Sequence, residues 1–354
     1  MKQPIDNVNN GPAKPKRRIR YKGTHPRHFE EKYKELNFDK YTLDVEKIIQ
    51  SGKTPAGTHR PVCVNEILDI LKPLPGQTGL DATLGFGGHA VELLKRIIPN
   101  GRLFALDIDP LELVRAQKRL RAMGFGEKEL IIKRGNFAGM FKLIGSAGVG
   151  FDFVLADLGL SSMQLDNPAR GFTFKRQGPL DLRFNPKRGQ TAVTLIRSLN
   201  EKQLEKLFVK NSDEPLARTI AYAVFKNRTR INMTRDLAEV VACALGAKSR
   251  LDWDSKIRGS IRRIFQALRI KVNDEFSALE QFLRNLPYCL KAQGRAAILT
   301  FHSGEDKRVM DFFEQGFSSG LYANISHKPI RPSAREQYSN PRSKSAILRW
   351  AIKK

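Results

Sequence analysis

The feature that most constrains the fold is a regular alternation of strand-like and helix-like segments that begins at Pro61. Apolar residues recur with helical spacing in some segments and form short continuous runs in the others. Such alternation is typical of βαβ units and predicts a parallel sheet covered by helices. In chain order, we expect a helix at 64–71, a strand ending at Asp81, a helix at 90–98, a strand at 102–108, a helix from Asp109 to about Met123, and strands at 130–133 and 151–156.

The alternation stops after Asp166, and for about 100 residues the patterns are helical or irregular. One of the helices there should begin at a capping box formed by Asn200 and Gln203. A strand pattern returns only at 295–301, followed by a helix at 306–315 and a last strand at 346–352. We therefore predict an α/β protein in which one sheet domain, 43–166 and 273–354, is interrupted by an inserted, mostly helical domain at 167–272.

Charge narrows the class of partner. The chain has 62 Lys and Arg against 36 Asp and Glu, a formal net charge of +26. Such an excess favours a polyanion, because a bound polyanion releases its counterions. The alternative is a basic surface without specific contacts. Residues 1–42 hold a basic run from Lys14 to Lys22 and are expected to be a flexible arm that either lies along phosphates or is simply solvated.

Other classes are disfavoured. Cys63, Cys243 and Cys289 are far apart and lack C-x-x-C spacing, so neither a disulfide framework nor a metal site is expected. No apolar run is long enough to cross a bilayer, and the first residues lack the hydrophobic region of a signal peptide. We expect a cytoplasmic protein without a membrane partner. The sequence leaves the oligomeric state open, and a dimer is one of the options.

A glycine-rich turn follows the first strand, with the sequence Asp81-Ala-Thr-Leu-Gly-Phe-Gly-Gly-His89. Glycines there permit positive φ angles and close approach of a ligand, and the next helix offers free N–H groups. Asp107 ends the second strand 20 residues after Gly87, where a carboxylate can accept both ribose hydroxyls of an adenosine. This pattern fits either a nicotinamide dinucleotide or S-adenosylmethionine, and a simple tight turn is the alternative.

A polar cluster follows the fourth strand, with the sequence Asp157-Leu-Gly-Leu-Ser-Ser-Met-Gln-Leu-Asp166. Methyl transfer to an amine needs acceptors that orient N–H groups, whereas hydride transfer gains little from this set. The cluster therefore favours S-adenosylmethionine. The structural alternative is that Asp157 and Ser161 only cap the next segment.

With these motifs, the chain resembles the RsmH (MraW) family of ribosomal RNA cytosine-N4 methyltransferases. The resemblance covers about residues 59 to 352 and includes both motifs above. Further matching segments are Arg170-Gly-Phe-Thr-Phe174, Gly178-Pro-Leu-Asp-Leu-Arg183, Phe265-Gln-Ala-Leu-Arg-Ile270 with Val272-Asn273, Phe301-His-Ser303 with Glu305-Asp306, and Asn340-Pro-Arg342 with Ser345-Ala346. Where the family usually has leucine and arginine, this chain has Gly304 and Lys307, a change expected to loosen that turn. Leu182 replaces a usual methionine at nearly constant volume.

The resemblance implies a Rossmann-like class I fold, S-adenosylmethionine as cofactor, and an inserted substrate-recognition domain. The implied reaction is methylation of the exocyclic N4 amine of a cytidine in the decoding region of small-subunit (16S) rRNA. The partner would be that RNA or the assembling small subunit. The implied cofactor contacts are Gly87, Gly88, His89, Asp107, Phe137, Asp157 and Gln164.

For the chemistry, we expect Asp157 to orient the target amine, with Ser161 and Ser162 assisting. Because N4 is reached only on an unstacked base, aromatic rings should hold that base. Phe172 and Phe174 are candidates, and their packing inside the insert is the alternative. The predicted phosphate contacts are Arg262, Arg263 and Arg269, for which a solvated helix face is the alternative.

Two competing functions remain at this stage. A protein or DNA amino methyltransferase would use the same cofactor pocket. A basic RNA-binding assembly factor with a vestigial pocket would need no Asp157.

Overall fold

The computed structural model describes residues 61–354, so the predicted basic arm at 1–42 and residues 43–60 of the sheet domain lie outside the described residues. The centre of the fold is a seven-stranded sheet with the order β3-β2-β1-β4-β5-β7-β6. Neighbouring strands from β3 to β5 pair in parallel, whereas β7 is antiparallel to both β5 and β6. The predicted Rossmann-like α/β sheet is thus confirmed. Its strands are β1 (Thr78–Asp81), β2 (Arg102–Asp107), β3 (Leu130–Arg134), β4 (Phe151–Asp157), β5 (Leu290–Thr300), β6 (Tyr322–Ile325) and β7 (Ile347–Lys353).

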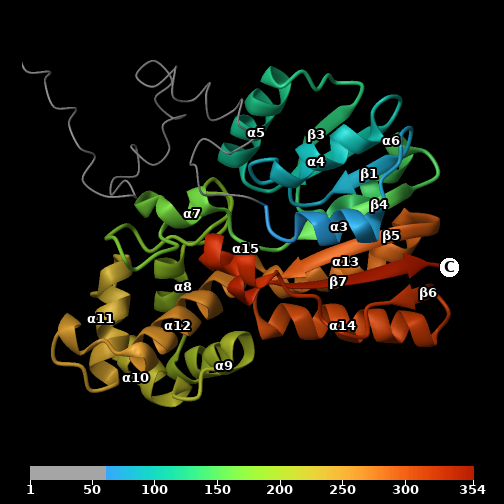
Figure 1. Cartoon of the computed structure of the whole chain (residues 1–354). Coiled ribbons are helices and arrows are strands. Elements are labelled where there is room, and N and C mark those ends of the chain that lie inside the picture. The colour runs from blue at the N-terminus through green and yellow to red at the C-terminus, as the bar shows by residue number, and fades with distance from the viewer. Residues whose placement is uncertain (1–60) are drawn as a thin grey trace, which may run out of the picture.

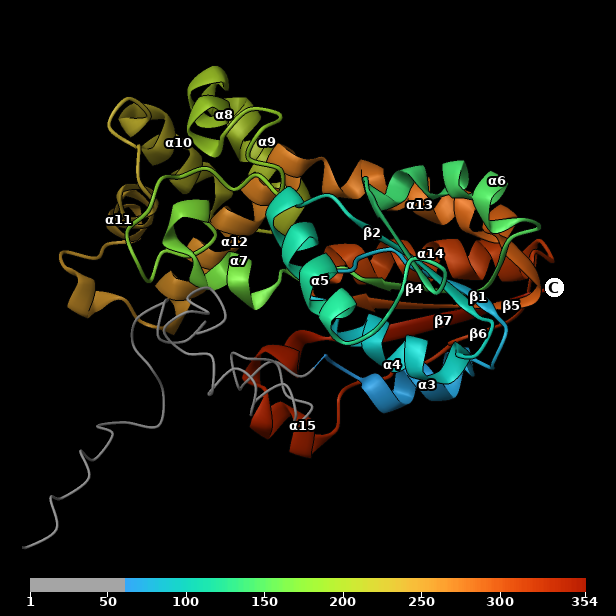
Figure 2. The ribbon, with the colours of Figure 1, turned by 90° about the horizontal axis from the view of Figure 1, so that it is seen from above.

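Helices cover both faces of this sheet (Figure 2). One face packs against α3 (Val64–Leu71), α4 (Gly88–Ile97) and α5 (Pro110–Ala122). The other packs against η2 (Phe137–Leu143), α6 (Ile144–Ala147), α13 (Glu275–Cys289) and α14 (Ser303–Ser318). Alternate strand residues feed the two cores: Leu103 and Phe153 enter the first, and Phe104 and Val154 the second.

Local sequence explains where α5 begins. The Asp109 side chain accepts hydrogen bonds from the backbone N–H groups of Leu111 and Glu112, and Pro110 occupies the first helical position. The helix start predicted at Asp109 is therefore confirmed.

The insert forms a separate group of helices beyond the carboxyl ends of the parallel strands (Figure 1). The buried residues of its core run from Phe172 to Leu268, with Phe208, Ile220 and Ile261 fully buried, and the partly buried Leu160 and Leu165 pack against them. The capping box predicted at Asn200 and Gln203 begins α9. The elements between β4 and α13 are α7 (Ser162–Asp166), η3 (Pro168–Arg170), α8 (Ala192–Ser198), α9 (Glu201–Ser212), α10 (Ala217–Asn227), α11 (Thr234–Ala244), η4 (Arg250–Asp252) and α12 (Ser255–Asn273).

Several elements differ from the sequence-based prediction, and β5 begins at Leu290, five residues earlier than expected. The prediction lacked α13, although its buried residues Phe276, Leu279 and Leu283 have helical spacing. The four-residue edge strand β6 was also absent from it, because so short a pattern carries little signal. Helix α14 begins at Ser303, three residues earlier than expected, because the His302 side chain accepts the N–H of Glu305. The chain then passes through α15 (Ala334–Ser339) and η5 (Pro341–Ser345) into β7.

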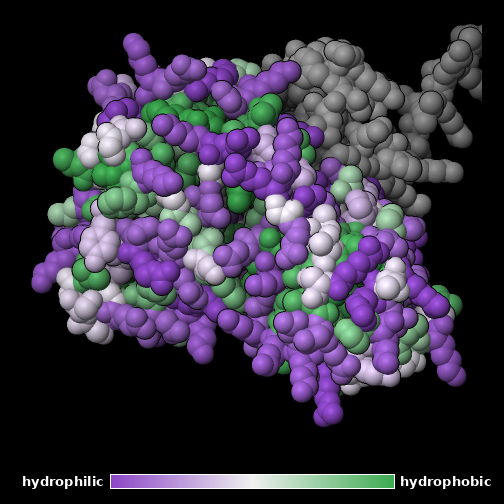
Figure 3. Space-filling model, turned by 180° about the vertical axis from the view of Figure 1, so that it is seen from behind, coloured by the Kyte–Doolittle hydropathy of each residue, from purple (hydrophilic) through white to green (hydrophobic). Residues whose placement is uncertain are grey.

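Hydrophilic side chains dominate the face seen from behind, over both the sheet domain and the insert (Figure 3). This agrees with amphipathic helices that turn their polar sides to solvent. Among residues 61–354, no helix combines the length and apolarity needed to cross a membrane.

Candidate active site

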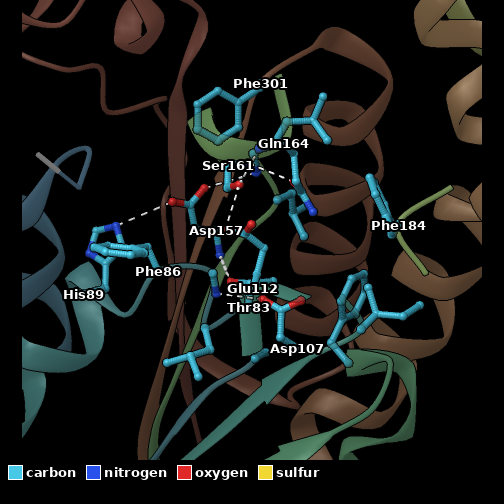
Figure 4. Close-up of a pocket in the computed structure, with 18 of the residues that line it drawn as sticks. Thr83, Phe86, His89, Asp107, Glu112, Asp157, Ser161, Gln164, Phe184 and Phe301 are labelled. Atoms are coloured by element: carbon cyan, nitrogen blue, oxygen red, sulfur yellow. Dashed lines mark hydrogen bonds and ion pairs between the residues drawn. The ribbon is translucent and has the colours of Figure 1, made fainter. Parts of the chain in front are cut away.

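A cavity of about 260 Å³ opens at the carboxyl edge of the sheet (Figure 4). Its walls come from the β1–α4 turn, the ends of β2, β3, β4 and β5, and the start of α13. The insert adds Phe184, and the end of α12 adds Asn273. Binding sites of open α/β sheets lie at this edge, so the cavity is the candidate active site.

The β1–α4 turn has the backbone that its glycines predicted. Gly85 and Gly87 have φ angles of 50° and 83°, which favour glycine. Gly88 and His89 line the cavity, as does Phe86 between the glycines. Gly87 does not line it. Its N–H donates to the carbonyl of Leu84, and a Cβ at Gly87 would lie 3.0 Å from Leu120 of α5. We therefore revise the prediction for Gly87, which forms the turn and packs against α5.

His89 and Asp157 face each other across the cavity. The His89 Nε2 atom is buried without a hydrogen-bond partner and lies 3.6 Å from Asp157 Oδ2. Asp157 is held in place, because its N–H donates to Thr83 Oγ1 at 2.6 Å and its Oδ1 accepts the N–H of Gly159 at 3.1 Å. Asp157 Oδ2 therefore points toward His89 Nε2, a buried atom that makes no hydrogen bond.

Asp107 lies at the end of β2 and lines the same cavity. Its two oxygens accept the N–H groups of Gly85 at 2.7 Å and Asp109 at 2.8 Å, which ties the glycine turn to the second strand. Burial raises the pKa of Asp107 to about 6, despite these hydrogen bonds. Each carboxylate oxygen retains a lone pair for a ligand hydroxyl.

Glu112 is a lining residue that the sequence did not reveal. Its side chain is buried, and burial followed by the charge of Asp109 raises the pKa of Glu112 to about 7. An acid in the first turn of a helix is common, so its position gave no functional signal.

Ser161 and Gln164 form a capping box at the start of α7. The Ser161 hydroxyl accepts the N–H of Gln164, and the Gln164 side-chain oxygen accepts the N–H of Ser161. The Ser161 hydroxyl also lies 3.3 Å from Glu112 Oε2, to which it donates. The alternative that Ser161 caps the next segment therefore accounts for its hydrogen bonds. Ser161, Ser162 and Gln164 nevertheless all line the cavity.

Asp109 connects Gln164, which lines the cavity, to Arg170 of the insert. This fully buried carboxylate accepts from Gln164 Nε2 at 2.8 Å and pairs with Arg170 Nη1 at 2.7 Å. Arg170 in turn donates through Nη2 to the carbonyls of Arg183 and Phe184. One buried ion pair thus holds the loop that carries Phe184 into the cavity.

The predicted stacking residues Phe172 and Phe174 do not line the cavity. Phe172 is buried in the insert core and stacks on Phe184, with ring centroids 5.9 Å apart. Phe174 packs against Trp253 and Phe265. We correct this prediction, because both rings are needed to fill the insert core.

The three predicted arginines do not form one basic face. The apolar side of α12 faces the insert core, and two of the three arginines are held in ion pairs. Arg263 pairs with buried Glu214 at 2.7 Å, and Arg269 pairs with Glu275 at 2.8 Å. Arg262 is exposed, and its Nε donates to the carbonyl of Arg258 in the same helix. The prediction is therefore revised for Arg263 and Arg269 and stays a prediction for Arg262.

Phe137 and Phe184 occupy the side of the cavity near α13. Phe137 lines it, with its ring edge-on to Phe282, and its contact with the cofactor stays a prediction. Phe184 was missed, because it lies in a loop without periodicity. Asn273 positions Phe184: Asn273 Oδ1 accepts the N–H of Phe184, and its Nδ2 donates to the carbonyl of Leu182, both at 2.7 Å.

The turn at Gly304 is not loose. A Cβ at Gly304 would lie 2.8 Å from the ring of Phe276, which occupies the space that a larger residue would need. Gly304 lies in the first turn of α14, and its carbonyl accepts from Arg308. The expected loosening is therefore wrong.

One group near the cavity offers metal-type ligand atoms within 4.8 Å of one another, namely Glu275, His302 and Glu305. Arg269 already neutralises Glu275 through two hydrogen bonds, and Glu305 accepts the N–H of Phe301. These contacts account for the group without a metal ion.

The sheet distinguishes between the two cofactor classes that the sequence left open. In dinucleotide-binding Rossmann domains the strands follow the order 3-2-1-4-5-6 in one direction. Here antiparallel β7 lies between β5 and β6, which is the arrangement of class I methyltransferases. Fold and cavity together define an S-adenosylmethionine-dependent methyltransferase.

Comparison with known proteins identifies the family. Residues 56–354 match the model of the MraW methylase family, and the chain belongs to this family. It is 49% identical over 349 residues to ribosomal RNA small subunit methyltransferase H 2 of Alkaliphilus metalliredigens, covering 98% of this chain and all of that protein. It is 48% identical to methyltransferase H 1 of Lachnoclostridium phytofermentans, covering 96% and 93%. The corresponding protein of Crocosphaera subtropica is 39% identical, covering 85% and 90%.

Proposed function

We propose that this protein methylates the exocyclic N4 amine of a cytidine in the decoding region of small-subunit rRNA, with Asp157 as the residue that orients the amine. The observation that carries the proposal is the position of Asp157 in the cavity, with Oδ1 fixed by Gly159 and Oδ2 directed toward His89. The names of the relatives support small-subunit rRNA as the substrate.

The cavity residues fit S-adenosylmethionine. Asp107 has lone pairs for ribose hydroxyls, and Phe137 offers an apolar surface for adenine. Gly88, His89 and Gln164 complete the proposed cofactor contacts, and the unpartnered Nε2 of His89 provides a buried polar atom for the ligand. When bound, the sulfonium supplies an already activated methyl group.

The chain's own residues then have two tasks. The first is to align N4 with the sulfur–methyl bond, since proximity and orientation supply most of the rate. The second is to manage the hydrogens of N4. As the nitrogen–methyl bond forms and the sulfur–methyl bond breaks, N4 loses one proton, for which Asp157 Oδ2 is the nearest fixed acceptor in our proposal. Ser161 supports α7, and Ser162 at its first position lines the same wall.

The test is mass spectrometry of small-subunit rRNA from cells with the gene intact, deleted, or restored on a plasmid. Deletion should remove one N4-methylcytidine from the decoding region, and restoration should return it. Labelled methyl transfer in vitro to small subunits, free DNA and ribosomal protein should label only the RNA. Labelling of DNA or protein, or an unchanged rRNA in deleted cells, would contradict the proposal.

A further inference from the structure

We propose that the ring of Phe301 is the platform on which the target base stacks while its amine is methylated. This inference rests on the proposed function, because only an unstacked nucleobase with an exocyclic amine requires such a surface. Enzymes that modify a base hold it outside the helix between aromatic or apolar side chains. Phe301 had no assigned role in the sequence analysis.

Phe301 directly follows β5, next to the strand that ends in Asp157. In the parallel pairing of β4 and β5, Asp157 lies opposite Leu299, so Phe301 extends two residues beyond that pair. Its N–H donates to Oε2 of buried Glu305 at 2.8 Å. The ring lines the cavity above Asp157 and Ser161, on the side away from Asp107 (Figure 4). It therefore lies on the side of Asp157 opposite the proposed ribose site.

Gly159 places this ring beside the carboxylate. A Cβ built on Gly159 would lie 2.7 Å from Cε2 of Phe301 and 3.1 Å from Oδ1 of Asp157. Real side chains do not tolerate the first distance, so the ring rests on bare backbone. The edge of the Phe301 ring and the Asp157 carboxylate therefore both lie beside Gly159. A base stacked on the ring would bring its amine to Asp157.

The other cavity phenylalanines already have partners for their rings. Among the residues that the structure describes, Phe301 is the one cavity phenylalanine without an aromatic or cationic neighbour on its ring. The partnered rings are Phe86 with Arg119 at 4.6 Å, Phe137 with Phe282 at 5.3 Å, Phe184 with Phe172 at 5.9 Å, and Phe276 with Arg308 at 3.6 Å. A cavity-lining aromatic ring without such a neighbour, next to the proposed amine acceptor, is what a base platform requires.

The experiment compares Phe301→Leu, Phe301→Tyr and wild type in methyl transfer to small subunits from cells that lack the gene. Leucine keeps most of the apolar volume but has no π face, whereas tyrosine keeps the face. We expect Phe301→Leu to lower kcat/KM for the small subunit about ten- to hundredfold. Phe301→Tyr should stay within about threefold of wild type. Phe317→Leu in α14 is the matched control, because the Phe317 ring packs edge-on to His327 outside the cavity, and it should lose less than about threefold.

Calorimetry with S-adenosylhomocysteine separates a platform from a structural role. The platform predicts that Phe301→Leu binds this product as wild type does. A Phe301→Leu variant within threefold of wild-type activity would overturn the inference, as would a loss of cofactor affinity equal to the loss of activity, or a tyrosine variant no better than leucine. Absence of methyl transfer by the wild-type protein would instead refute the proposed function.

Discussion

The cavity and the insert core both contain aromatic and ionisable side chains, but the contacts of these side chains differ between the two regions. In the insert core, Phe174 packs on Phe265, and Arg263 pairs with Glu214. In the cavity, the buried Nε2 of His89 has no hydrogen-bond partner, and among the described residues the ring of Phe301 has no aromatic or cationic neighbour. Folding alone accounts for the first set but leaves the second unexplained. Within the cavity, a buried polar atom without a hydrogen-bond partner therefore indicates a ligand contact more directly than residue type does.

The largest expected effect tests the insert side of this comparison. Phe208 is fully buried in the insert core, and Phe208→Ala should lower the free energy of unfolding by about 3–5 kcal/mol. Denaturant unfolding measures this loss. Below the transition, the affinity for S-adenosylhomocysteine should be unchanged, because the residue lies in a separate core. A loss below about 1 kcal/mol would show that the insert core contributes little.

The cavity side should behave in the reverse way. Asp157→Asn keeps the acceptor for the Gly159 N–H but removes the charge, so kcat should fall about 10²–10³-fold. The free energy of unfolding should change by less than about 0.5 kcal/mol. Single-turnover methyl transfer and denaturant unfolding measure the two quantities. If the variant retained more than a tenth of wild-type kcat, Asp157 would not be the amine acceptor.

A smaller effect concerns pH. Burial raises the pKa of Asp107 to about 6, so cofactor affinity that depends on the ionised carboxylate is present above pH 6 and lost as the pH falls through it. Asp107→Asn should weaken S-adenosylhomocysteine binding about tenfold at pH 7.5 and remove this pH dependence. Calorimetry between pH 5 and 8 tests it.

Without cofactor, ionisation of Asp107 acts in the opposite sense, because it lowers the free energy of unfolding. The folded protein holds the Asp107 proton more tightly than the unfolded chain, so ionisation costs stability. The free energy of unfolding should therefore fall as the pH rises from about 4 to about 6, and Asp107→Asn should flatten part of that fall. An identical profile in the variant would contradict the assignment.

The smallest effect separates two adjacent arginines. Exposed Arg262 remains a predicted phosphate contact, so Arg262→Met should weaken small-subunit binding about two- to threefold and lower its salt dependence. Arg263→Met should instead reduce stability by about 1 kcal/mol, because it leaves Glu214 unpaired, with little effect on RNA binding. Filter binding at several salt concentrations and thermal melts provide the readouts. Equal losses of small-subunit binding in the two variants would support the original prediction of one basic face that includes both arginines.

The sequence predicted the sheet and the polar edge of the cavity well, because both follow from local rules. Strand and helix periodicity located β1 to β4, and Asp109 followed by Pro110 marked the start of α5. Asp107 and Asp157 end parallel strands, and parallel strands bring their carboxyl ends to one edge.

The missed residues depend on contacts between distant segments. Phe184 reaches the cavity only because Asn273 and Arg170 hold its loop, 89 and 14 residues away in the chain. Glu112 looks like an ordinary helix start until Asp109 and Ser161 are placed around it. Phe172 and Phe174 illustrate the opposite error, because an aromatic motif near a catalytic strand looks the same whether it faces a ligand or a core.

The placement of the whole insert between β4 and β5 has a kinetic consequence. These strands are neighbours in the sheet, yet everything from Leu158 to Cys289 must be looped out before they can pair. Long-range parallel pairing slows folding, because loop closure is costly before any contact repays it. Helix α12 returns the chain at Asn273, so an insert that packs around its own core first would leave a shorter loop to close before β4 and β5 pair.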